Sequence, residues 1–359
     1  MVRHLSGALA IALGTIGLAA QGCGSDAPAT DGSSSGGSSG SFNVGDGGLL
    51  GDGSTACATD TKKAEKQPVD MVIGLDTSFS MDFDSKWANV RDALKAFASN
   101  PAYADLGVGL QFFPIRKQCS VADYQVPAVP LGLQPQAAGP IAAALDAQQM
   151  AGGTPMVPLL EGLTKYLAAN AKPGRKPVIV LATDGVPDDT CLSSENGSLP
   201  NTLENAVAVA DGALKGTPSI ATFVIGVGGE LTALNAIAVA GGTGSATLVD
   251  TGGNAQQALL AALDNVRRKA IPCDYDIPPG TIDPQSTNVT YTSAGSTRQL
   301  VFVGNEASCA KAPDGAGWYF DDEAAPKKVV LCKAMCESVK GDDSGSVDLV
   351  FGCPRVGVK

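Results

Sequence analysis

Continuous apolar runs alternate with segments of helical periodicity between residues 57 and 273. Such runs predict strands buried on both faces, as in an open and mostly parallel sheet covered by helices. The expected strands lie at 70–76, 106–114, 178–184, 219–227 and 245–250, with a short antiparallel edge strand at 126–131. The expected helices lie at 86–99, 137–148, 156–170, 202–215, 231–240 and 254–269. The pattern therefore predicts an α/β domain with a doubly wound, mostly parallel six-stranded sheet.

The pattern changes after Cys273, where several prolines mark a linker. Short β-like runs separated by Gly, Asp and Pro turns follow at 289–292, 300–303, 329–331 and 347–351. Residues 334–339 have the periodicity of one or two helical turns, and Trp318-Tyr319-Phe320 is typical of a core strand. This spacing predicts a small β-rich module at 274–359.

Polar side chains follow two of the predicted strands at the points where the strands end. Asp76, Ser78 and Ser80 come directly after the apolar run 71–75, and Asp184 follows the run 177–182. The carboxyl ends of parallel strands meet at one edge of a sheet, where ligands bind. Carboxylate and hydroxyl oxygens are ligands that suit Mg²⁺ and similar cations. Helix capping by Asp and Ser is the alternative reading of the first motif.

A third polar residue, Thr154, lies in Gly152-Gly153-Thr154-Pro155, just ahead of a predicted helix. Asp-x-Ser-x-Ser at 76–80, this Thr and Thr183-Asp184-Gly185 together resemble the metal-ion-dependent adhesion site (MIDAS) of von Willebrand factor A (vWA) domains. The resemblance covers residues 57–270 and implies the Rossmann-like vWA fold. It also implies that Ser78 and Ser80 bind the metal directly, that Thr154 joins or leaves the coordination shell, and that Asp76 and Asp184 bind directly or through water.

Coordination counting extends this interpretation to a partner. Mg²⁺ takes six oxygens, and the five side chains cannot all be inner ligands without strain, so water and an open position complete the shell. The resemblance implies that Asp or Glu of a protein partner enters that position. Mn²⁺ or Ca²⁺ is an alternative to Mg²⁺. The sequence thus predicts cation-dependent protein binding and no enzyme activity, and the alternative is an envelope protein whose metal serves only stability.

The start of the chain predicts export. Residues 1–22 combine a positive end with a short apolar segment, which is typical of a signal peptide. Cys23 after small residues resembles a bacterial lipoprotein box, in which this cysteine becomes the acylated N-terminus; a plain secretory signal is the alternative. By the common rule for such lipoproteins, Gly24 favours the outer membrane. Residues 23–56 are rich in Gly and Ser and predict a flexible tether.

The cysteines agree with export. Without Cys23 the chain has an even number, which in an exported protein predicts disulfides. The preferred pairs are Cys57–Cys273, Cys119–Cys191, Cys309–Cys332 and Cys336–Cys353. Cys332 and Cys336 also have a spacing that suits zinc ligands, so zinc binding by these two cysteines is the alternative to their disulfides. The tail also resembles the cysteine-bearing ends of lipoproteins from myxobacteria-like bacteria, a match that implies no activity.

Charge and histidine content exclude several functions. The net charge is −11, and removal of a signal that carries Arg3 makes it about −12, with no basic stripe for nucleic acid. His4 is the only histidine and leaves with the signal, so a Ser-His-Asp triad and a histidine zinc site are excluded. The expected membrane contact is through the N-terminal lipid only.

Overall fold

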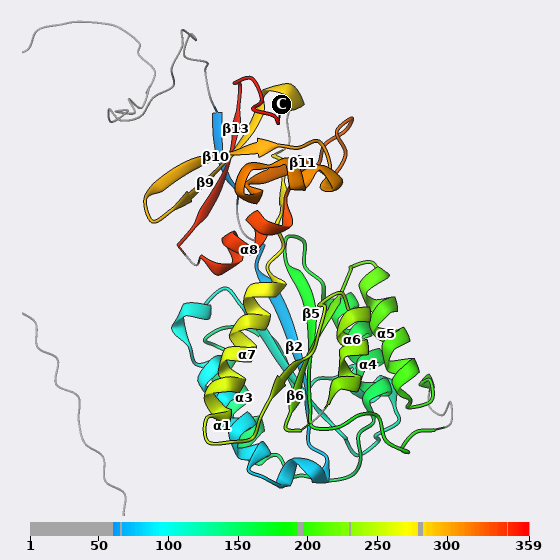
Figure 1. Ribbon diagram of the computed structural model, residues 1–359. Coiled ribbons are helices and arrows are strands. Elements are labelled where there is room, and N and C mark those ends of the chain that lie inside the picture. Colours follow the sequence, from blue (N-terminus) through cyan, green and yellow to red (C-terminus); the bar gives the residue numbers. More distant parts are fainter. Residues whose placement is uncertain are drawn as a thin grey trace, which may run out of the picture. The chain divides into compact units, whose positions relative to one another are not determined.

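The computed structural model describes residues 60–64, 67–192, 197–229, 231–278, 283–342 and 344–358, which form two β-sheets with their helices (Figure 1). The first sheet has six strands in the order β4-β3-β2-β5-β6-β7. Their bounds are β2 Val69–Asp76, β3 Gly107–Phe113, β4 Val129–Leu133, β5 Lys176–Thr183, β6 Ala221–Val227 and β7 Thr247–Val249. Only β4 at the edge pairs antiparallel to its neighbour, and the predicted fold class is confirmed.

Helices cover both faces of this sheet (Figure 1). One face carries α1 Lys86–Ala98, α3 Ala138–Ala147 and α7 Ala255–Ala270. The other carries α2 Val121–Tyr124, α4 Met156–Asn170, α5 Leu203–Lys215 and α6 Asn235–Ala240. Side chains alternate along each strand, so Ile73 belongs to the first core cluster and Val72 to the second. Two buried layers explain why the strands read as continuous apolar runs.

The second sheet has seven strands in the order β1-β13-β9-β10-β11-β12-β8. Their bounds are β1 Asp60–Ala64, β8 Asp274–Asp276, β9 Thr287–Ser293, β10 Ser296–Phe302, β11 Gly317–Phe320, β12 Lys328–Leu331 and β13 Ser346–Phe351. Helix α8, Lys333–Gly341, packs Met335 and Val339 into the core of this sheet around the fully buried Trp318. The β-like runs and the helical turn of the tail are therefore present.

One strand of the second sheet comes from before the first sheet in the sequence. β1 pairs antiparallel with β13, with Asp60 opposite Phe351 and Ala64 opposite Val347. The sequence predicts residues 60–64 as part of the first domain, 57–273, and this part of the predicted boundary is wrong. The first sheet is thus inserted, in sequence, between strands β1 and β8 of the second.

The disulfides partly match the predicted pairs. Cys119 bonds to Cys191 and Cys309 to Cys332, as predicted. Cys273 bonds to Cys336, so the predicted pairs Cys57–Cys273 and Cys336–Cys353 are wrong. The reason lies in the strand pairing.

Leu331 donates its N–H to the carbonyl of Cys273 at 2.9 Å, which sets Cys273 beside the end of β12, where α8 follows with Cys336. The disulfides of Cys332 and Cys336 also exclude the zinc alternative. Cys353 is disulfide-bonded as well. Cys57, the signal segment 1–22, Cys23 and the whole tether 23–56 lie outside the described residues. Within the described part of the chain, no helix is both long and apolar enough to cross a membrane.

Candidate functional site

The two acidic motifs lie at the same edge of the first sheet. Strands β2 and β5 are parallel neighbours, with Leu75 opposite Ala182, so their carboxyl ends lie side by side. Asp76 is the last residue of β2 and is fully buried, and Asp184 directly follows β5 with its side chain 0% exposed. The topology therefore brings together two carboxylates that are 108 residues apart in the sequence.

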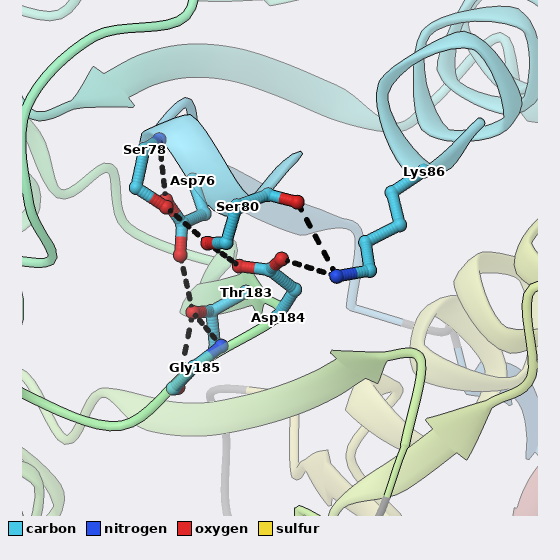
Figure 2. Close-up of polar contacts among 7 residues, drawn as sticks. All are labelled: Asp76, Ser78, Ser80, Lys86, Thr183, Asp184 and Gly185. Carbon is cyan, nitrogen blue, oxygen red and sulfur yellow. Dashed lines mark hydrogen bonds and ion pairs between the residues drawn. The ribbon is translucent and has the colours of Figure 1, made fainter. Parts of the chain in front are cut away.

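Hydrogen bonds link the serines to these carboxylates (Figure 2). The backbone N–H of Ser78 donates to Asp76 Oδ1 at 2.8 Å, and the hydroxyls of Ser78 and Ser80 lie 3.0 Å apart. Ser80 Oγ donates to Asp184 Oδ1 at 2.8 Å. Ser78 is buried, whereas Ser80 is exposed, so the series of oxygens runs from the interior to the surface.

Thr183 belongs to the Thr183-Asp184-Gly185 motif, but the sequence assigned it no role at the site. Its hydroxyl donates to Asp76 Oδ2 at 2.5 Å and accepts from the N–H of Gly185 at 3.1 Å (Figure 2). The pKa of Asp76 is nevertheless raised to about 6, chiefly by burial and to a smaller extent by the charge of Asp184, against the lowering by hydrogen bonds from Thr183 and Ser78. Asp76 is thus a carboxylate that would ionise more readily beside a cation.

Thr154 approaches the same edge from the loop before α4. A Cβ on Gly185 would lie 3.7 Å from Thr154 Oγ1, which places this hydroxyl close to the peptide that follows Asp184. Phe79 N–H donates to the carbonyl of Gly152 at 3.4 Å, a contact that joins the Thr154 loop to the serine motif. The structure therefore gathers all five predicted residues at one edge of the sheet.

Asn201 holds this loop and was also missed. Its side chain is buried; it donates to the carbonyls of Thr154 at 3.0 Å and Asp188 at 3.1 Å and accepts from the N–H of Val157 at 3.0 Å. All three contacts are made with backbone atoms, so no side-chain motif in the sequence indicates them. Lys86 was missed for a different reason: at the start of a helix it reads as a surface lysine, yet it bonds to Asp184 (Figure 2).

The donor set fits a hard divalent cation. It offers two enclosed carboxylates and three hydroxyls, the oxygen ligands that Mg²⁺ and Mn²⁺ prefer. No group of three or more His, Cys, Asp or Glu in the described ranges is arranged to hold a metal. An ion at this edge would therefore depend on the hydroxyls of Ser78, Ser80 and Thr154 as well as on Asp76 and Asp184.

Several solved structures are similar to the chain. No protein-family model and no curated protein matches it. The pilus adhesin SpaC of Lactobacillus rhamnosus GG is 16% identical over 82% of this chain and 40% of its own length, with a TM-score of 0.44. Manganese-loaded TRAP of Plasmodium vivax is 16% identical over 66% of this chain and 91% of that one, with a TM-score of 0.41. The von Willebrand factor domain of the pilus tip protein Mfa5 of Porphyromonas gingivalis is 11% identical over 61% of this chain and 99% of that one, with a TM-score of 0.41.

The chain spans 40% of the length of SpaC, and all three identities and TM-scores are low. The assignment of the fold therefore depends on the strand order of the first sheet and on its single antiparallel edge strand, β4. The first sheet and its helices form a vWA-like domain. The predicted resemblance in fold is confirmed on that basis.

Proposed function

We propose that the chain is a lipid-anchored protein of the bacterial cell envelope that binds a protein partner through a divalent cation. The observation that carries the proposal is the set of contacts from Asp76 through Ser78 and Ser80 to Asp184. Together with Thr154, these residues would hold the ion, with Mg²⁺ or Mn²⁺ as the preferred choice. The bound ion would supply a coordination position for Asp or Glu of the partner.

Apolar side chains around the site support a protein as the partner. Phe79 and Phe83, on either side of Ser80, are 62% and 65% exposed, and Val186, two residues after Asp184, is 41% exposed. Exposed apolar side chains close to a polar site are typical of protein-binding surfaces. The adhesins among the similar structures are consistent with a surface protein, and acylation of Cys23 with the tether 23–56 would place the domain outside the cytoplasm.

Packing favours a binding role over a purely structural role for the ion. The core clusters of both sheet faces consist of apolar residues such as Leu75, Phe97 and Leu159, each at 0% exposure, and contain none of the five site residues. A domain of this size with two apolar core clusters buries enough surface to be stable through its own packing. We therefore keep partner binding as the proposed function, with metal-dependent stability as the second candidate.

Removing the cation is expected to abolish partner binding while leaving the fold intact. The purified chain is used as bait on cell-envelope extracts in buffer with Mg²⁺ and in buffer with excess EDTA, and circular dichroism follows the fold in both. Ser80→Ala protein is the matched bait because it lacks one hydroxyl of the site. Capture of the same proteins in EDTA as in Mg²⁺ would contradict the proposal. Unfolding in EDTA would favour the structural candidate.

A further inference from the structure

Lys86 places a second cation at the proposed metal site. Its Nζ donates to Asp184 Oδ2 at 2.8 Å and to the carbonyl of Ser80 at 3.3 Å (Figure 2). Lys86 is the first residue of α1, where a positive charge is unfavourable because it meets the positive end of the helix dipole. The contact with Asp184 offsets that cost and accounts for a lysine at this position.

The ion pair is enclosed rather than held at the surface. The side chain of Lys86 is 16% exposed and that of Asp184 is 0% exposed. A Cβ on Gly228 would lie 3.2 Å from Lys86 Cε, so the stem of the lysine packs against the backbone just after β6. Gly228 has φ +86°, a conformation that glycine adopts freely, and it leaves room for this stem. Helix α1 and the backbone just after β6 thus direct the ammonium of Lys86 towards Asp184.

The two oxygens of Asp184 are both engaged. Oδ1 accepts from Ser80 Oγ and Oδ2 accepts from Lys86 Nζ. A divalent cation that draws on Asp184 must share this carboxylate with the ammonium, and the two positive charges repel each other over a few ångströms in a partly enclosed environment. The ammonium of Lys86 and a bound metal ion would therefore compete for the same carboxylate.

We propose that Lys86 is an internal cation that competes with the metal for Asp184 and lowers the divalent-ion affinity of the site. This inference rests on the proposed metal site. Lys86 also balances the charge of Asp184 in the metal-free protein, where an enclosed carboxylate without a partner would be destabilising. Lys86 thus stabilises the metal-free state and acts as a positioning residue for Asp184.

Titration calorimetry with MnCl₂ tests this role on the purified chain. Lys86→Met is expected to bind Mn²⁺ at least about ten-fold more tightly than wild type, because the competing charge is gone. Lys86→Arg keeps the charge and is expected to stay close to wild type. Lys95→Met is the matched control: Lys95 lies on the same helix and also pairs with an aspartate, Asp146, outside the site, so its affinity is expected to be unchanged.

Thermal unfolding supplies a second readout. Without metal, Lys86→Met is expected to melt below wild type because Asp184 loses its partner, and Mn²⁺ is expected to raise its melting temperature more than that of wild type. Lys86→Gln keeps a donor towards Asp184 without the charge and serves in place of Lys86→Met if that variant does not fold.

The outcomes separate this inference from the proposed function. Tighter Mn²⁺ binding by Lys86→Met or Lys86→Gln supports the competition. If wild type binds Mn²⁺ and both variants bind it equally tightly or more weakly, the proposed competition is wrong, whereas the proposed metal site is still supported. If neither wild type nor the variants bind Mn²⁺, both the competition and the proposed metal site are contradicted.

Discussion

Replacing Asp184 with asparagine is expected to weaken Mn²⁺ binding by about 100-fold or more. The substitution removes one of the two carboxylates at the edge of the sheet, while the charge of Lys86 stays beside the site and repels the ion. The amide oxygen can still accept a hydrogen bond, so the shape of the site is largely kept. Titration calorimetry of wild type and Asp184→Asn with MnCl₂ measures the difference.

Asp189→Asn is the control for this prediction. Asp189 lies in the same loop and is exposed, and the substitution makes the same change in charge. Its effect on Mn²⁺ affinity is expected to be small because exposed charges are strongly screened. Equal affinities for wild type and Asp184→Asn would show that this carboxylate does not take part in metal binding.

Metal-free protein is expected to lose stability as the pH rises from about 4 to about 6. In the unfolded chain Asp76 has its ordinary pKa of 3.8 and ionises first, whereas burial raises the folded-state pKa to about 6. Between these values the folded protein holds one more proton than the unfolded chain, so raising the pH favours unfolding. The loss is of the order of 3 kcal/mol at neutral pH.

Denaturant unfolding in EDTA at pH 4 and pH 7 tests this dependence, with Asp76→Asn as the comparison. Asparagine does not titrate, so the difference in stability between the two proteins is expected to change with pH by roughly the stated amount. A difference that stays constant would contradict the assigned environment of Asp76. Added Mn²⁺ is expected to restore stability mainly above pH 6, where Asp76 is ionised.

The first sheet could be predicted closely from the sequence because its physical signal is strong. Parallel strands buried on both faces give continuous apolar runs, and the predicted helix at 156–170 coincides with α4. β1 escaped prediction because Asp60–Lys63 are polar and exposed, and its pairing with β13 spans the whole first domain. Long-range pairing of an edge strand leaves little local trace in a sequence.

The site was predictable to the same degree. Asp76, Ser78, Ser80, Thr154 and Asp184 stand at element ends, where the topology fixes their proximity. Asn201 acts through the loop before α4, Thr183 through a direct hydrogen bond to Asp76, and Lys86 through a contact with a residue 98 positions further along the chain. The Cys273–Cys336 bond likewise depends on the pairing of β8 with β12, which the spacing of cysteines does not encode.

The central claim is that a divalent cation binds between these side chains. Anomalous diffraction from crystals of the chain grown with Mn²⁺ tests it most directly. We expect one strong manganese peak at coordination distance from the hydroxyls of Ser78 and Ser80, on the side that faces Asp184. No peak at that place under saturating Mn²⁺, or a peak only at other acidic residues, would contradict the account.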